Sequence, residues 1–247
     1  MDYNIFVNYV DESKTQNELE SLKNNYTFFY SPPYLEEVAN IKHVNRKERI
    51  DKYILYIDRL FERNIFLPVE NGDIIAYKER ARETFERVIK YLHMTKTAED
   101  LEYKQMKAFK MMQNEFLFDS KVISNIATDQ IFYDDKVQSF LDFINIHANN
   151  FIIFRLPMEN AYFYLSNHRK TEQLISTLFN VLESIGYKGE KIKKSVSRLH
   201  DVSHAIYATK ADIFVTNDVR FAAKCRAVYE YAGVTTKVMS YDEFLRL

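Results

Sequence analysis

A chain of 247 residues with 47% hydrophobic side chains is long enough for one large domain, or for a domain that carries a sizeable insert. Its formal net charge of -1 excludes a global attraction to nucleic acid, so a polyanion would have to be held by a local basic patch or through metal ions. The one cysteine, Cys225, excludes an internal disulfide framework and fits a reducing compartment. We expect a soluble, cytoplasmic protein without a membrane partner, because no apolar run approaches a membrane span and the first residues do not resemble a secretion signal.

The first 46 residues combine helix and strand signals. Residues 12–24 are rich in Lys and Glu and predict a polar helix, and the aromatic run 27–30 is typical of a strand. Ser31 is a good N-cap, and the two prolines that follow it suit a first helical turn. The next helix is therefore expected to start at about Tyr34.

The middle of the chain, residues 47–150, reads as nearly all helix. Apolar residues recur there at helical spacing, and charged residues fill the other faces. Residues 71–73, Asn-Gly-Asp, are the clearest internal turn. The aromatic and methionine side chains of this segment are interpreted as core packing rather than as a ligand groove.

The last third alternates helix and strand again. Residues 151–154 are a strand or the start of another buried element, and residues 171–186 form an amphipathic helix that stops at Gly186. A basic segment at 188–198 leads into a predicted helix at 200–208 that carries Asp201, and a buried strand follows at 213–216. The last predicted elements are a helix at 219–231, a strand at 234–239 and a short helix at 241–247. Such alternation predicts an α/β fold for 1–46 and 151–247, with 47–150 as a helical insert.

Four acidic residues stand where a sheet fold could bring them together: Asp2, Glu37, Asp201 and Asp218. Carboxylates at the carboxyl ends of strands lie where α/β folds bind ligands, and acids that are brought together repel each other unless a cation joins them. Mg²⁺ and Mn²⁺ prefer oxygen ligands and can activate a water for attack on a phosphodiester. A solvated Asp201, and an Asp218 that only caps the next helix, are the alternatives.

These motifs resemble those of the PIN-domain nucleases. Asp2-Tyr3-Asn4 is similar to the family's opening D-x-N motif, and residues 31–37 resemble a strand end in Ser followed six residues later by a helical Glu. Residues 200–208 resemble the third motif, an Asp in a helix with a small residue seven positions on, and residues 214–218 resemble the fourth, a T-N-D strand end. The resemblance covers about 1–45 and 190–247.

The resemblance implies a three-layer α/β/α sandwich with a mostly parallel central sheet. It also implies that the four acids are catalytic and hold Mg²⁺ or Mn²⁺, and that four polar residues support them: Asn4, Ser31, Thr216 and Asn217. Glu36 competes with Glu37, but the spacing from Ser31 favours Glu37. The family places the first Asp at the end of a central strand, whereas only Met1 precedes Asp2 here. Either that strand lies upstream or it is missing, and a missing strand would leave its neighbours with unpaired backbone groups.

The function predicted is a metal-dependent endonuclease in a toxin, defence or RNA-processing role, and the resemblance alone implies that it acts on RNA rather than DNA. An antitoxin or another protein partner, and a homo-oligomer, remain open. Three basic residues, Lys191, Lys194 and Arg198, could contact phosphates, and a solvated helix face is an equal alternative.

Two rival functions remain. The first is a non-catalytic module of the same kind that binds RNA or protein. The second is a zinc-dependent phosphohydrolase that uses His200, Asp201 and His204, since the two histidines are four residues apart and share a helix face. The zinc helix of the familiar kind needs a Glu directly after its first His, and none is present. One buried and one exposed histidine is the expected arrangement.

Overall fold

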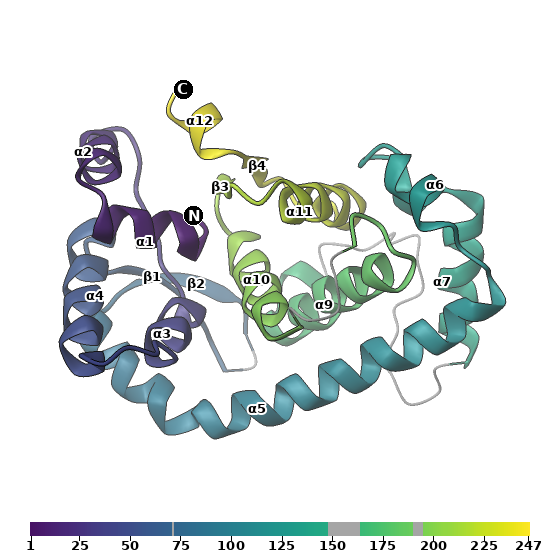
Figure 1. The fold of residues 1–247 in the computed structure, drawn as a ribbon, viewed down its shortest axis with the longest axis horizontal. Helices are drawn as coiled ribbons and strands as arrows, with labels where there is room; N and C mark the ends of the chain where they lie inside the picture. The colour runs from purple at the N-terminus through teal and green to yellow at the C-terminus, as the bar shows by residue number, and fades with distance from the viewer. Residues whose placement is uncertain (71, 148–163, 190–194) are drawn as a thin grey trace.

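The computed structural model describes residues 1–70, 72–147, 164–189 and 195–247. The first half of the chain forms α1 (Tyr3–Asp11), α2 (Ser13–Leu22), α3 (Pro32–Ala39), α4 (Arg46–Phe61), β1 (Asn64–Pro68), β2 (Ile74–Lys78) and α5 (Ala81–Met112). The second half forms the short helices 113–115 and 131–133 together with α6 (Ser120–Asn125), α7 (Asp135–His147), α9 (His168–Ser184), α10 (Ser195–Ala208), β3 (Ile213–Val215), α11 (Val219–Ala232), β4 (Lys237–Met239) and α12 (Tyr241–Phe244) (Figure 1).

The described chain is mainly helical, and the predicted three-layer sandwich with a mostly parallel central sheet is wrong. Its four short strands form two separate sheets of two strands each, antiparallel β1–β2 and parallel β3–β4. Two local features keep a larger sheet from forming. The chain enters α1 immediately after Asp2, and the extended run 27–30 contributes only a single parallel bridge, from Tyr30 to Ile65.

Many local predictions are confirmed. Ser31 occupies the N-cap of α3, with proline in the first turn, and α2 lies inside the predicted polar helix. Gly186 and Gly233 follow α9 and α11 with φ of 79° and 68°, a conformation that glycine adopts without steric cost. The predicted strand at 213–216 corresponds to β3. The possible strand at 151–154 lies outside the described residues.

The β1–β2 hairpin was not predicted, because residues 47–150 read as nearly all helix. Its register pairs Asn64 with Lys78 and Pro68 with Ile74. The predicted turn at 71–73 falls between the two strands, where the N–H of Gly72 donates to the carbonyl oxygen of Val69 at 2.9 Å; residue 71 lies outside the described residues. An Asn-Gly pair between two apolar runs is a strong hairpin signal, so the sequence did contain the information.

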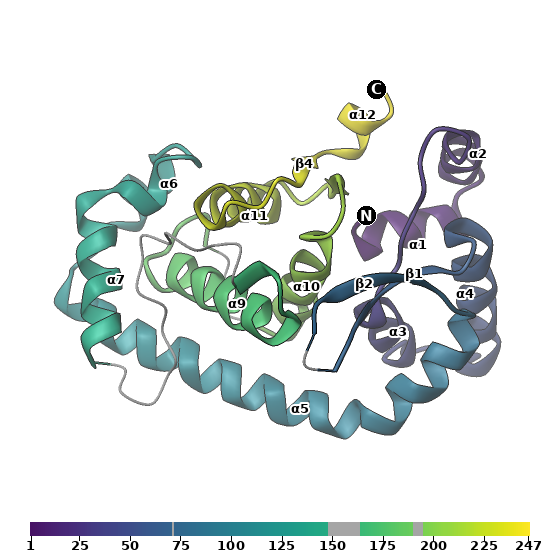
Figure 2. The same ribbon diagram turned by 180° about the vertical axis from the view of Figure 1, so that it is seen from behind.

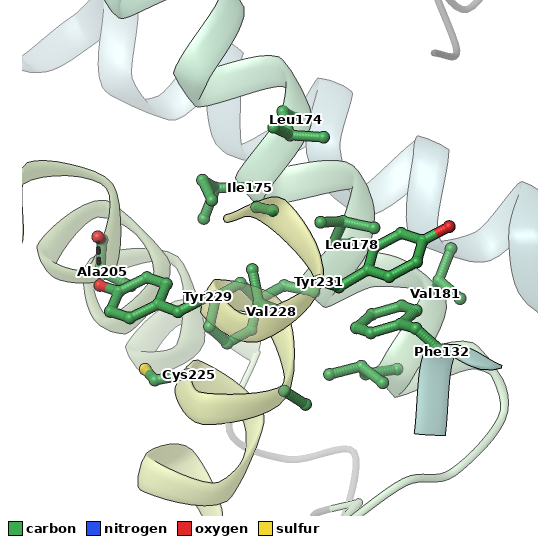
Figure 3. Packing of buried hydrophobic residues seen from close by; sticks show 14 of the residues in the cluster. Phe132, Leu174, Ile175, Leu178, Val181, Ala205, Cys225, Val228, Tyr229 and Tyr231 are labelled. Carbon is green, nitrogen blue, oxygen red and sulfur yellow. Dashed lines mark hydrogen bonds between the residues drawn. The ribbon is translucent and has the colours of Figure 1, made fainter. Parts of the chain in front are cut away.

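Buried side chains form two hydrophobic cores. The first joins α1, α3 and α4 to side chains from the far end of the chain, including Val215 and Phe244. The second joins α7, α9, α10 and α11, and it also takes in Phe66 and Phe109 from the predicted insert. Figure 3 shows side chains of this second core, where the Tyr229 hydroxyl donates to the carbonyl oxygen of Ala205 at 2.6 Å.

Helix α5 connects the two cores. It runs along the length of the molecule and packs against α3 in the first core and α9 in the second (Figures 1 and 2). Residues 47–150 therefore contribute side chains to both cores and share each of them with the flanking segments. Among the described helices, none combines the length and the apolar character that crossing a bilayer requires.

Candidate functional site

Asp2 lies beside the carboxyl end of β3 and is only 3% exposed. Its backbone N–H donates to the carbonyl oxygen of Val215 at 2.7 Å, and its carboxylate accepts a hydrogen bond from the Thr216 hydroxyl at 2.9 Å. Figure 1 shows the N-terminus next to β3. Two hydrogen bonds thus hold Asp2 at the end of β3, the same strand end that Asp218 follows.

Glu37 projects from α3 toward the same region. Tyr34, one turn earlier, donates its hydroxyl hydrogen to the carbonyl oxygen of Met1, which ties α3 to the start of the chain. Burial raises the pKa of Glu37 from 4.5 to about 8; nearby His200 opposes this shift, and the negative charge of Asp2 adds to it. The structure therefore brings Asp2 and Glu37 close enough to interact electrostatically.

Two histidines of α10 face the two glutamates of α3. His204 Nε2 lies 2.7 Å from Glu37 Oε1, and His200 Nδ1 lies 3.8 Å from Glu36 Oε2. Both histidines are buried, so the expectation of one exposed histidine is wrong. Their spacing of four residues, which places both on one helix face, was the signal for this.

The histidines of this cluster have lowered pKa values because burial disfavours the charged imidazolium. Burial lowers the pKa of His204 from 6.5 to about 4, with the Asp2 charge opposing the shift, and it also lowers the pKa of His200. Burial thus disfavours the charged form of each partner in the Glu37–His204 contact.

Asp201 is half-buried on α10 and lies near α11. Burial raises the pKa of the Cys225 thiol well above its usual value, and the negative charges of Asp201 and Asp2 raise it further. Cys225 is a residue of α11, whereas His200 and His204 contact α3. Asp201 and Asp2 thus share a neighbour on the second-core side of the site.

Asp218 is exposed and caps α11, as the capping alternative predicted. Its carboxylate accepts hydrogen bonds from the backbone N–H groups of Arg220 and Phe221, each at 2.9 Å. Its own backbone N–H donates to the Thr216 hydroxyl at 3.2 Å, and this hydroxyl in turn donates to Asp2. Thr216 therefore links the backbone of Asp218 to the carboxylate of Asp2.

The other predicted residues have diverse placements. Asn4 is exposed on α1, and Ser31 is buried at the start of α3. Asn217 is exposed, and its side-chain oxygen accepts a hydrogen bond from the backbone N–H of Tyr241 at 3.0 Å, which joins the end of β3 to α12. Three predicted phosphate contacts lie outside the described part of the structure: Lys191, Lys194 and the side chain of Arg198.

The donor chemistry of this region suits a hard divalent cation. Asp2 and Glu37 offer carboxylate oxygens in a region of low exposure, and Mg²⁺ is commonly held by one or two carboxylates together with water and substrate phosphates. Within the described residues, no group of three or more His, Cys, Asp and Glu side chains lies close enough to hold a metal ion. A cation bound by Asp2 and Glu37 would therefore need water or substrate oxygens for the rest of its coordination shell.

Comparison of the chain with protein-family models, with curated proteins and with solved structures gives no match.

The Glu37 carboxyl is expected to titrate with a midpoint near 8, because burial and the Asp2 charge both favour its protonated form. The measurement is a pH titration of the side-chain carboxyl carbon by ¹³C NMR, with Glu37→Gln to assign the signal. A midpoint close to the ordinary 4.5 would contradict the desolvated environment of this half-buried residue.

The same shift has a defined effect on stability. Between about pH 4.5 and 8 the folded protein holds a proton on Glu37 that the unfolded chain has released. The contribution of this proton to the free energy of unfolding is therefore fully present below pH 4.5 and is lost as the pH rises through 8. The buried Met1 amino group, whose pKa falls from 8.0 to about 6, acts in the opposite sense between those two values. The effect should therefore be measured as the difference in the free energy of unfolding between wild type and Glu37→Gln. We expect wild type to become less stable relative to this variant as the pH rises.

Proposed function

We propose that this chain is an endonuclease that depends on Mg²⁺ or Mn²⁺ and hydrolyses phosphodiester bonds, with RNA as its substrate. The observation that supports the proposal is the hydrogen bond of Asp2 to the carboxyl end of β3, with Glu37, 35 positions further along the sequence, near enough for the Asp2 charge to raise its pKa. Such strand ends are where α/β units bind ligands. The choice of RNA rests on the resemblance of the four motifs to PIN-domain nucleases.

The chain's own residues have distinct roles in this proposal. Asp2 and Glu37 bind the cation, and Asp201 and Asp218 complete the acidic set around the substrate. Thr216 holds the Asp2 carboxylate in place, and His204 holds that of Glu37. A bound cation would supply the positive charge that activates a water and stabilises the charged phosphodiester in its transition state. A toxin, defence or RNA-processing role, and a protein partner of the antitoxin kind, belong to the same proposal.

The direct test is cleavage of labelled RNA by the purified protein with Mn²⁺, with EDTA as the control. We expect cleavage with the metal and none after chelation. RNA binding without cleavage in any divalent metal would favour the non-catalytic module instead. Stoichiometric zinc in the purified protein would favour the phosphohydrolase, although His200 and His204 contact α3 glutamates while Asp201 lies near Cys225.

Divalent metal is expected to raise the melting temperature, because it binds the folded chain in preference to the unfolded one. At a free metal concentration about 100 times Kd the increase should be roughly 5–10 °C for a chain of this length. Because the cation competes with the Glu37 proton, the increase should be larger above about pH 8 than near pH 6.

The control for this measurement is the double variant Asp2→Asn, Glu37→Gln, followed by differential scanning calorimetry. We expect the metal-dependent increase to disappear in this variant. An equal increase in wild type and the double variant would place the cation elsewhere in the protein.

A further inference from the structure

A pocket of about 370 Å³ lies between residues 25–31 and residues 211–215. Its walls combine aromatic side chains such as Phe28 and Phe214 with polar ones such as Lys210 and Asp212, and Met1 is also part of its lining. This volume is within the range of sites that bind ligands. The pocket adjoins the acidic site, because its lining includes His204, which contacts Glu37.

One wall of the pocket is the free edge of β3. The carbonyl of Asp212 accepts from Lys237 and the N–H of Thr216 donates to Met239, so these residues turn their peptide groups toward β4. Peptide groups alternate in direction along a strand, and those of Ile213 and Val215 therefore point away from β4. In the described chain the one backbone bond on this edge is that from the Asp2 N–H to Val215.

The other wall is the extended run that ends at Tyr30. The N–H of Tyr30 donates to the carbonyl of Asn64 at 3.1 Å, and its carbonyl accepts from the N–H of Phe66 at 2.9 Å, so the peptide groups of Tyr30 face β1. By the same alternation, those of Phe29 face away from β1. Within the described residues, no backbone hydrogen bond to Phe29 is found.

We propose that this pocket is a binding slot for one extended strand of a partner protein, which inserts between β3 and residues 27–30. A strand suits this slot because its backbone presents N–H and C=O groups on both sides, and the peptide groups of Ile213, Val215 and Phe29 that face away from their own sheets could pair with them, which a small apolar ligand could not do. The hydrogen bond from the Asp2 N–H to the Val215 carbonyl already occupies one position on this edge of β3, and an inserted strand would add further backbone hydrogen bonds beside it. The apolar lining selects valine, isoleucine or aromatic side chains, and proline is excluded where an N–H is needed.

An occupied slot would also affect the neighbouring site. Ser31, Tyr34 and His204 line the same pocket, and Asp2 is bonded to its β3 wall. A bound strand would restrict the movement of these residues. The partner would therefore regulate the activity of the acidic site. Strand binding itself does not depend on nuclease activity and is tested separately from it.

The test uses the full chain and a short acetylated, amidated peptide of alternating valine and isoleucine with flanking lysines. The matched control peptide carries N-methyl groups on alternate residues, which removes the donors on one side. Isothermal titration calorimetry should show binding of the first peptide. The Kd of the control peptide should be higher by roughly tenfold or more, since each lost hydrogen bond weakens the affinity several-fold. Amide hydrogen exchange at Ile213, Val215 and Phe29 should slow about tenfold or more when the peptide is bound.

Equal binding of the two peptides, or binding with unchanged exchange at Ile213 and Val215, would overturn the proposal. Protection of these amides that increases with protein concentration in the absence of peptide would also overturn it, because a second copy of the chain would then fill the slot. Ala211→Phe, which places a ring in the pocket, should abolish peptide binding, whereas Ala127→Phe at an exposed site should not. The two peptides on the wild-type chain decide the question even if Ala211→Phe does not fold.

Discussion

Asp2→Asn and Glu37→Gln are each expected to lower the rate of metal-dependent RNA cleavage by roughly 100-fold or more. Loss of a residue that supports a metal ligand already costs 10–100-fold, so loss of a ligand charge should cost at least as much. Both substitutions keep the shape of the side chain. The amide oxygen that replaces the carboxylate of Asp2 can still accept the hydrogen bond from Thr216, so the fold should persist.

The measurement is the single-turnover cleavage rate together with circular dichroism and thermal melting for each variant. Asp242→Asn, an equivalent change at an exposed residue of α12, is the matched control and should cleave at the wild-type rate. Asp201→Asn and Asp218→Asn should also lose activity if all four acids act together. Asn caps a helix as well as Asp does, so Asp218→Asn should melt normally. Full activity in Asp2→Asn and Glu37→Gln would refute the site.

Phe132→Ala is expected to lower the free energy of unfolding by about 3–5 kcal/mol, the cost of a large cavity in a packed core. Phe132 is 1% exposed and belongs to the predicted helical insert. Its ring stacks on that of Tyr231 in α11, with centroids 4.7 Å apart and an angle of 20° between the planes (Figure 3). The loss follows because this residue completes a core that it shares with the C-terminal third of the chain.

Urea unfolding of Phe132→Ala, of Tyr231→Leu and of the double variant gives the interaction between the two rings. We expect a coupling of about 0.5–1.5 kcal/mol, as for other aromatic pairs. Tyr91→Ala, which removes a 60% exposed aromatic ring on α5, should change stability by less than about 1 kcal/mol. If Phe132→Ala were as mild as this control, the Phe132 ring would not complete the core that it shares with α11.

Local signals in the sequence located most helices, and the sheet could not be predicted from them. The N-cap at Ser31 and the glycines at 186 and 233 act within one turn of chain, so a sequence pattern records them directly. Sheet size depends on which distant segments meet. The run 27–30 has strand composition, yet only Tyr30 forms a bridge to β1, and residues 3–11 form α1 rather than a strand.

The site was predictable in part. Spacing and motif order identified Asp2 and Glu37, and the structure brings these two together. The role of His204 was missed, because the sequence does not indicate that α10 packs with its histidine face against α3. For the same reason the sequence could not indicate that Asp201 would lie near Cys225, on another side of the helix.

Cys225 offers a chemical record of how the two cores unfold. The thiol is fully buried in the second core, and its raised pKa suppresses the thiolate, so an alkylating reagent reacts only when that core opens. Under conditions of rapid reclosing, the labelling rate divided by that of a free thiol gives the opening equilibrium of α9, α10 and α11. If α5 couples the two cores, this local free energy equals that of global unfolding. The one cysteine of the chain is thus an internal reporter of cooperativity across the molecule.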